Sequence, residues 1–269
     1  MRRRPAAIVA GAKELPVRRE DPPTSLHREF ERSGARFFRY RSFLPLLLLP
    51  LVVADLLDFR YVGGSHLKTE LWQLFGFLVA LTGLGVRAFT GATVPAGTSS
   101  SNTACQVADA LNTTGMYSVV RHPLYLGNYL MWLGFLLAFL SWWMVLLVTC
   151  GFALYYERIM FAEEAFLRQK YGTSFDDWAA VTPAFLPRWR RWRPASLSFS
   201  WRAVLRREYS GFLGVSFAFF VSDVIGDSGV QGRLAYDRHW AVLLGFALVA
   251  SVVLRTLRRH TKVLTVAGR

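Results

Sequence analysis

The chain has 269 residues, of which 53% are hydrophobic, and its formal net charge is +14. Its mean hydropathy is +0.27 and its pI is about 10.4. A soluble basic protein rarely combines such apolarity with such charge, whereas a polytopic membrane protein with arginines gathered at one surface does. The arginines lie between apolar runs and not on a polar domain, so we expect no nucleic-acid partner. The two cysteines, Cys105 and Cys150, fit neither a disulfide framework nor a metal-binding spacing.

Residues 1–41 form a polar arm with eleven lysines and arginines. Its first part, through Pro22-Pro23, has the composition of a disordered segment. The part from Ser25 to Arg41 is predicted to be an amphipathic helix on the membrane surface. Its apolar side would carry Phe30, Phe37 and Phe38.

Six apolar segments follow the arm, judged against the roughly 20 residues that a helix needs to cross a bilayer. They are residues 42–58, 70–90, 124–140, 142–165, 209–224 and 238–257. The first and fifth are short, and the first contains two prolines. The predicted fold class is therefore all-α: a polytopic integral membrane helical bundle of about six transmembrane helices.

The charges of the loops predict the orientation. Basic residues crowd the N-terminal arm, residues 188–207 and residues 255–262, whereas the alternate loops near 59–69, 141 and 225–237 carry few. By the positive-inside rule both termini are cytoplasmic, which an even number of spans permits. The loop 91–123 then also faces the cytoplasm, and the polar motifs beside it would form a cytoplasmic active site.

The most informative motif is Arg121-His122-Pro123-Leu124-Tyr125-Leu126-Gly127, which opens an apolar helix. Proline suits the first turn of a helix, and the N–H groups and positive dipole end of that turn favour an anion. Ionisable residues at the mouth of a bilayer indicate function more often than packing. The alternatives are that His122 caps the helix and that Arg121 anchors to lipid phosphate.

A second polar group, Arg158 with Glu163-Glu164, lies where the next apolar helix runs out. The two glutamates are about 100° apart on a helix, so one can face a pocket while the other faces water or a basic partner. The alternative is a solvated helix end with a local ion pair. Gly83 and Gly85 permit a close approach of backbone, either to another helix or to a ligand. Metal binding has little support, because His122 has no second ligand at helical spacing and His239 lies far away in the sequence.

Taken in order, these motifs resemble the core of the isoprenylcysteine carboxyl methyltransferase family, which overlaps with the membrane phospholipid methyltransferases. The resemblance covers roughly residues 70–190. It rests on the 121–127 motif, Arg158, Glu163-Glu164, Tyr171-Gly172, Trp178, Pro183 and Pro187. Gly83-x-Gly85 and Glu163-Glu164 also resemble the paired S-adenosylmethionine motifs of phosphatidylethanolamine N-methyltransferases. We expect three regions: the basic arm 1–41, a membrane methyltransferase core at 42–194, and an extension at 195–269 with two further spans, for which the resemblance supplies no role.

The resemblance implies S-adenosylmethionine as the cofactor and assigns expected roles. The expected cofactor-binding residues are His122, Tyr125, Leu126, Gly127, Glu163, Glu164, Gly83 and Gly85. Arg158, with Arg121 as second choice, is expected to hold an anionic group of the acceptor, because a guanidinium fork suits carboxylate or phosphate. The alternatives for Arg158 are an internal ion pair with Glu157 or Glu163 and contact with lipid.

The expected function is methyl transfer to a lipid or prenylated acceptor in the bilayer, on a carboxylate or another oxygen. An anionic oxygen needs no general base, whereas an ammonium must first lose a proton. Two other interpretations stay open at this point. Membrane sterol reductases, which use NADPH, share a similar late pattern, and a non-enzymatic membrane scaffold could use the same fold. The sequence does not identify the acceptor or the oligomeric state.

Overall fold

A computed structural model describes residues 25–40, 47–95, 97–98, 109–139, 141–266 and 268. The regular elements of these residues are helical, and Gly115 with Arg193 forms an isolated bridge. The α-helices are α1 (Ser25–Tyr40), α2 (Leu49–Leu57), α3 (His66–Ala92), α4 (Pro123–Phe139), α5 (Trp142–Tyr171), α6 (Thr173–Val181), α7 (Trp201–Gln231) and α8 (Arg238–His260). Short 3-10 turns are η2 (Val62–Gly64), η3 (Met116–Ser118) and η4 (Trp189–Arg191). The expected disorder before Pro22-Pro23 concerns residues outside the described ones.

The predicted all-α membrane bundle is confirmed, but six full spans are not. In the described residues, α3, α5, α7 and α8 are long and apolar enough to cross a membrane, and α4 is a shorter apolar helix. Within the described part of the predicted first span, residues 47–58, the α-helix is α2, whose nine residues extend about 14 Å at 1.5 Å per residue. That is less than half of a hydrocarbon core about 30 Å thick. Conversely, α7 is much longer than the predicted 209–224.

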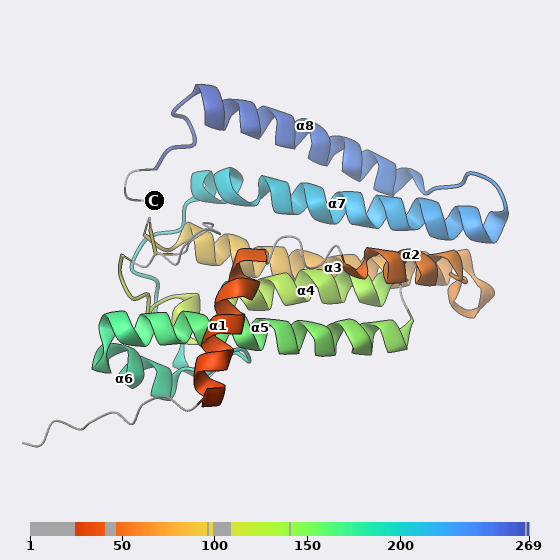
Figure 1. Cartoon of the computed structure of the whole chain (residues 1–269). Coiled ribbons are helices and arrows are strands. Elements are labelled where there is room, and N and C mark those ends of the chain that lie inside the picture. The colour runs from red at the N-terminus through yellow and green to blue at the C-terminus, as the bar shows by residue number, and fades with distance from the viewer. Residues whose placement is uncertain are drawn as a thin grey trace, which may run out of the picture.

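The long helices α3, α4, α5, α7 and α8 lie side by side and alternate in direction (Figure 1). We call the end that carries residues 109–122, residues 182–200 and the C-terminus the loop end, and the opposite end the turn end. The α7–α8 connection and the link from α2 to α3 lie at the turn end. The arginine-rich stretch 188–207 and residues 255–262 lie at the loop end, so the bundle gathers its basic loops on one side, as the sequence predicted.

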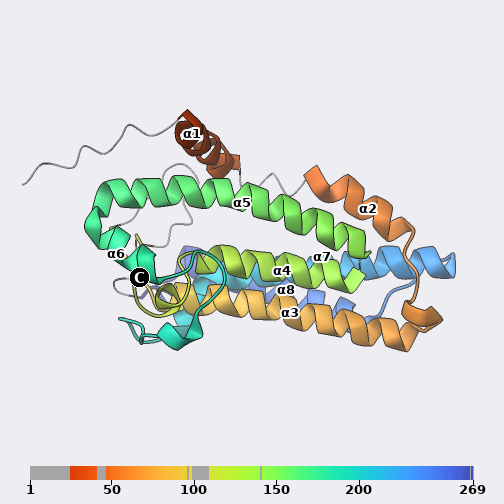
Figure 2. The same cartoon turned by 90° about the horizontal axis from the view of Figure 1, so that it is seen from below.

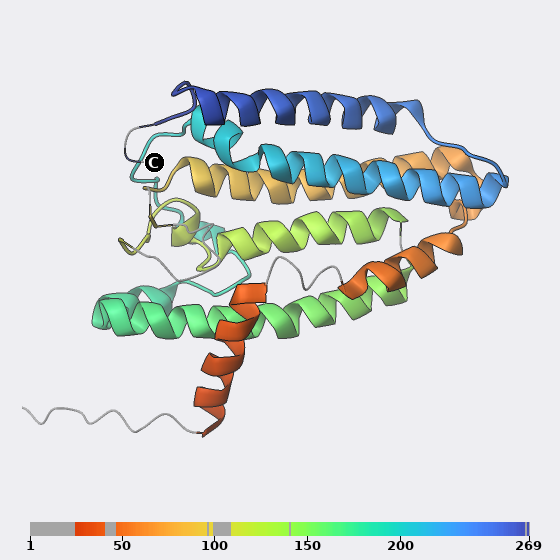
Figure 3. The ribbon, with the colours of Figure 1, turned by 45° about the horizontal axis from the view of Figure 1, so that its top comes forward.

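The helix predicted for the N-terminal arm is present as α1, and it runs crosswise to the bundle against the outer side of α5 (Figures 2 and 3). Gly34 makes this crossing possible. A Cβ there would collide with the carbonyl oxygen of Arg158 and lie 2.8 Å from Cβ of Ala162. Phe37 adds a ring contact to Tyr155 at 5.2 Å, and the Tyr155 hydroxyl donates to the Phe37 carbonyl over 2.7 Å. The orientation suits a helix that lies in the plane of a membrane surface.

Glycines set the closest helix pair, α3 against α4. A Cβ on Gly76 would lie 2.5 Å from the carbonyl oxygen of Gly134, and a Cβ on Gly83 would lie 2.5 Å from that of Gly127. Two pairs seven residues apart therefore form a seam in which the backbones touch, as small residues allow between membrane helices. Gly85, by contrast, faces no atom within 4 Å.

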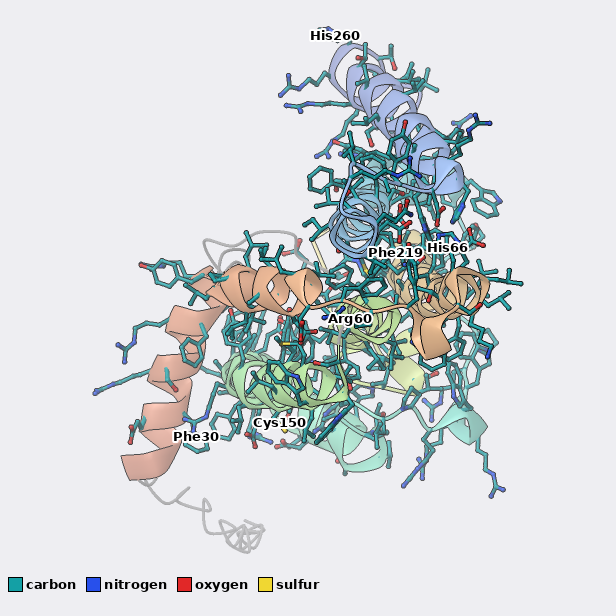
Figure 4. All side chains as sticks on the ribbon, turned by 90° about the vertical axis from the view of Figure 1, so that its right-hand side faces the viewer. Phe30, Arg60, His66, Cys150, Phe219 and His260 are labelled. Carbon is teal, nitrogen blue, oxygen red and sulfur yellow. The ribbon has the colours of Figure 1, made fainter. Side chains whose placement is uncertain are left out.

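Above this seam, α7 closes the core with Phe219, which is labelled in Figure 4. Its ring centroid lies 5.2 Å from that of Phe77, 5.3 Å from that of Phe139 and 5.1 Å from that of Trp240. Edge-to-face and tilted rings at these separations pack favourably. At the turn end Asp55 of α2 accepts from the backbone N–H and the hydroxyl of Ser141, at 2.9 and 2.7 Å. The aspartate thereby fixes α2 to the start of α5.

Candidate functional site

Two neighbouring residues at the loop end, Arg121 and His122, immediately precede α4. Their backbone N–H groups donate to the carbonyls of Pro183 and Ala184, at 2.9 and 3.2 Å. The segment after α6 thus fixes the start of α4. Its carbonyls accept hydrogen bonds from two of the backbone N–H groups at the helix start, which are therefore not available to bind an anion. Pro123 occupies the first helical position, where its missing N–H costs no hydrogen bond.

The acidic pair of α5 reaches this helix start. His122 Nε2 lies 2.9 Å from Oε1 of Glu164, and His122 Nδ1 lies 3.5 Å from Oε2 of Glu163. Arg121 Nε lies 2.9 Å from the same Glu164 oxygen. We call these four residues the His122 cluster. The structure therefore places together four of the residues that the sequence singled out, from positions about forty residues apart.

His122 is buried, with 6% of its surface exposed. Burial alone would lower its pKa, but the hydrogen bonds and negative charges of Glu163 and Glu164 outweigh it, so the pKa lies above the ordinary value. The cation is therefore favoured over a wider range of pH than in a free histidine. With both carboxylates ionised and Arg121 charged, the cluster is then electrically balanced.

Arg121 retains hydrogen-bonding capacity. One guanidinium nitrogen, Nη1, donates to the carbonyl of Ala179 over 2.8 Å. Nε lies within ion-pair distance of Glu164, but its N–H is buried and has no aligned acceptor in the described residues. A buried donor without an acceptor is costly, and an oxygen of a bound molecule could satisfy it.

Aromatic rings line the side of the cluster that faces the bundle. Tyr125 is stacked on the His122 ring at 5.6 Å, and its centroid lies 4.8 Å from that of Tyr156. Tyr156 is in turn stacked on Phe152 at 4.0 Å. This wall of π faces suits a cationic or planar ligand. Leu126 instead packs into an apolar cluster beneath the 109–122 loop.

Further residues of the motif stabilise the loop end. Gly172, with φ +55°, ends α5 and donates its N–H to the carbonyl of Arg168 over 2.9 Å. The left-handed conformation there is one that glycine adopts without strain. Trp178 of α6 donates its indole N–H to the carbonyl of Tyr117 over 3.0 Å. Gly172 and Trp178, which belong to the sequence pattern of the resemblance, thus help to position residues 109–122 and the segment after α6, which meet at His122.

Four predicted site residues lie elsewhere. Arg158 is turned about 140° around α5 from Glu163, and its guanidinium lies over the Phe30 ring of α1 at 3.6 Å. Gly83 and Gly127 face each other in the helix seam. This agrees with the alternative that Gly83 allows close packing of helices and does not contact a ligand. Because the opposing backbone fills the space that a Cβ would take, these two glycines offer no open face there, whereas Gly85 does.

The sequence reasoning missed a buried polar network beside the cluster. Arg87 Nε and Nη2 donate to the two carboxylate oxygens of Glu208, at 3.0 and 3.2 Å. Arg87 Nη1 donates to the amide oxygen of Asn128, and the amide of Asn128 donates to the Tyr156 hydroxyl over 3.4 Å. The network joins α3, α4, α5 and α7. The sequence does contain a signal for this network, because Arg87 is a charged residue inside the apolar run 70–90. Charged residues within membrane segments are costly and usually have a partner or a function.

Comparison with known proteins supports a family assignment for the middle of the chain. Residues 72–174 match the model of the phospholipid methyltransferase family. The match confirms the family that the motifs indicated and points to a membrane methyltransferase.

Two curated relatives match parts of the chain. The nickel-cobalt-cadmium resistance protein NccN of Alcaligenes xylosoxydans xylosoxydans is 37% identical over 86 residues, which are 32% of this chain and 40% of the relative. The cobalt-zinc-cadmium resistance protein CzcN of Cupriavidus metallidurans is 33% identical over 125 residues, 45% of this chain and 57% of the relative. The chain thus spans about half the length of the curated relatives it matches. No solved structure matches the chain.

Proposed function

We propose that this protein is an integral membrane methyltransferase that uses S-adenosylmethionine and acts on a lipid or isoprenoid acceptor. The observation that carries the proposal is the His122 cluster: a charged helix start and an acidic pair in contact, inside the region that matches phospholipid methyltransferases.

The residues of the cluster fit the chemical groups of that cofactor. When bound, S-adenosylmethionine supplies an activated methyl on a sulfonium, so the protein must chiefly bind, align and shield. Glu163, whose side chain is 28% exposed, is available to accept from an ammonium or from ribose hydroxyls. The Arg121 guanidinium, whose Nε lies beside Glu164 but has no aligned hydrogen-bond acceptor in the described residues, suits a carboxylate oxygen. The rings of Tyr125 and Tyr156 suit a cationic sulfonium and keep water away.

The protonation of His122 favours an oxygen acceptor. Two glutamates stabilise the imidazolium and raise its pKa, which makes the imidazole less available as a general base than a free histidine. An amine acceptor would have to lose a proton, whereas a carboxylate or phosphate oxygen would not. We therefore propose an anionic acceptor at an oxygen.

We propose that the site faces the cytoplasm and that the acceptor arrives from the bilayer. The basic stretch 188–207 at the loop end would favour that orientation and attract anionic headgroups. Arg121 is the better placed arginine for the cofactor or acceptor, because it belongs to the cluster. A role for Arg158 requires an acceptor that approaches along α1, where its guanidinium lies.

Isothermal titration of the purified protein with S-adenosylhomocysteine tests the cofactor assignment. We expect binding that weakens in Glu163→Ala and in His122→Ala. Glu157→Ala is the matched control, because Glu157 is an exposed carboxylate on the same helix. Unchanged affinity in both cluster variants would refute the placement. Binding of NADPH in place of S-adenosylhomocysteine would favour the reductase alternative, and binding of neither would favour a scaffold.

The relatives' names also suggest a physiological setting. Both are named for resistance to transition metals, and we propose that the methylation serves the same purpose here. Growth of a deletion strain on graded cobalt, zinc and cadmium, compared with a strain carrying Glu163→Ala, tests this. Equal growth of the wild-type and deletion strains would contradict it.

A further inference from the structure

A second group of ionisable side chains lies at the turn end, far along the bundle from the His122 cluster. His66 and Glu70 occupy the first turns of α3, Asp223 and Asp227 the C-terminal part of α7, and Asp237 immediately precedes α8. We call these five residues the acid–histidine cluster. His66 is labelled at this end in Figure 4. Three helices therefore contribute to one group.

The donor atoms have the spacing of metal ligands. His66 Nε2 lies 3.3 Å from Oδ2 of Asp227 and 3.4 Å from Oδ1 of Asp237. Ligands bound tetrahedrally at about 2.0–2.1 Å are about 3.3–3.4 Å apart. One carboxylate oxygen from each of Asp223, Asp227 and Asp237 lies within 4.8 Å of the others, and His66, Glu70 and Asp237 form a second such group.

One oxygen of a buried carboxylate in this cluster lacks a hydrogen-bond partner. Asp223 is 1% exposed, and Asp227 is 2% exposed. Asp223 Oδ2 accepts from the backbone N–H of Asp237 over 2.8 Å, but Oδ1 is buried without a hydrogen-bond partner in the described residues. An unsatisfied carboxylate oxygen inside a protein is expensive unless a proton or a cation neutralises it.

The surrounding positive charge does not balance the carboxylates. In the part of the chain that the structure describes, none of the four forms an ion pair with lysine or arginine. Arg233 lines the same cavity, but its guanidinium donates to the side-chain oxygen of Gln231 over 3.5 Å. His66 alone supplies at most one charge against four.

We propose that the acid–histidine cluster binds a divalent first-row transition ion such as Zn²⁺ or Co²⁺. One imidazole with several carboxylates is a nitrogen and oxygen donor set that these ions accept. A cavity of about 510 Å³, lined by His66, Asp227 and Asp237, leads to the ligands. His66 is 40% exposed at its side chain, so an ion can enter without unfolding the bundle.

The site stands apart from methyl transfer. All five residues lie outside residues 72–174, and they join the start of α3 to the two helices of the C-terminal extension. A bound ion would clamp α7 and α8 onto α3 at the turn end. The extension, for which the family resemblance gives no role, would then complete a metal site on the side of the membrane opposite the methyl-transfer site.

Metal binding to the untagged, chelator-treated full-length protein in detergent tests the proposal. ZnCl₂ should raise the Tm in a saturable way with one ion bound per chain, and CoCl₂ should give the visible absorption of a four-coordinate ion. His66→Gln and Asp227→Asn should each weaken Zn²⁺ binding by about 10-fold or more. Asp58→Asn and His239→Gln are the controls, because both residues are exposed at the same end, and they should bind like the wild type.

Three results would overturn the proposal. They are absence of Zn²⁺ or Co²⁺ binding by the wild type, equal binding by all four variants, and an equal rise in Tm with MgCl₂. The first would mean that a proton neutralises the buried carboxylates. The Co²⁺ spectrum of the wild type shows whether the protein binds the ion, even if a variant fails to fold. S-adenosylhomocysteine affinity, measured on the same samples, reports separately on the proposed function.

Discussion

The buried ion pair between Arg87 and Glu208 gives a quantitative test of how the bundle is held together. Glu208 has a side chain only 9% exposed, and Arg87 contacts both of its carboxylate oxygens. Arg87→Met keeps most of the side-chain volume but leaves a buried carboxylate without its cation. Removing one partner of a buried pair costs about 3–5 kcal/mol, and we expect that loss here.

The double variant should recover most of this loss. Replacing both partners with methionine removes the buried charges together, and such replacements are often neutral or stabilising. We therefore expect Arg87→Met/Glu208→Met to unfold within about 2 kcal/mol of the wild type. The two single losses should together exceed the loss in the double variant by at least about 3 kcal/mol, a coupling at or above the upper end for residues in one network.

SDS titration of the purified protein in mixed micelles, followed by tryptophan fluorescence, measures these free energies of unfolding. The control is the pair Arg168 and Asp176, which has a similar separation of 2.8 Å but side chains 48% and 52% exposed. Arg168→Met should cost less than about 1 kcal/mol. A coupling below about 0.5 kcal/mol for the buried pair would refute the reasoning, because it would mean that water solvates Glu208 as well as Arg87 does.

Three other predictions concern the site and the seam. Folding raises the pKa of His122, so its stabilisation is complete below the ordinary value of about 6.5 and is lost as pH rises through the raised value. The Tm difference between the wild type and His122→Asn should therefore shrink from pH 6 to pH 9, and a constant difference would contradict this. Gly83→Ala should destabilise the protein by about 1–3 kcal/mol, because its Cβ would lie 2.5 Å from the Gly127 carbonyl oxygen. Gly85→Ala is the control: its Cβ would meet no atom within 4 Å, so this variant should be neutral or stabilising. Equal unfolding curves for the two variants would refute the close packing of α3 against α4 at Gly83. If the acceptor approaches along α1, where the Arg158 guanidinium lies, Arg158→Lys should lower kcat/KM without changing S-adenosylhomocysteine affinity, and normal turnover would rule out a bidentate acceptor contact.

Much of the fold follows from local sequence. The predicted spans at 70–90, 142–165 and 238–257 correspond to α3, α5 and α8, because apolar runs of that length with polar ends are typical of membrane helices. The shortness of α2 within the predicted span 42–58 has a local cause as well. Pro50 lies at the start of α2, and a proline is readily accommodated only in a first turn, so the helix cannot extend through it from the N-terminal side.

The tertiary partners were harder to predict. Helical spacing shows that Arg158 and Glu163 face different ways, but it does not show that α1 covers the Arg158 side. Likewise, Arg87 and Glu208 are 121 residues apart. The sequence shows a single charge in an apolar run but does not show which residue pairs with it. The contact of His122 with the acidic pair was easier to anticipate, because the family resemblance places both motifs in one pocket. Its role in binding a cofactor stays a prediction.

The separation of charge between the two ends has an electrical consequence. The arginines of 188–207 and 255–262 lie at the loop end, and the buried aspartates of the acid–histidine cluster lie at the turn end. The molecule is therefore polarised along its long axis. Across a membrane with a negative interior, each elementary charge moved through 100 mV is worth about 2.3 kcal/mol. The membrane potential would therefore stabilise the orientation with the loop end inward, and each charge at the two ends would add to the free energy that opposes inversion of the protein.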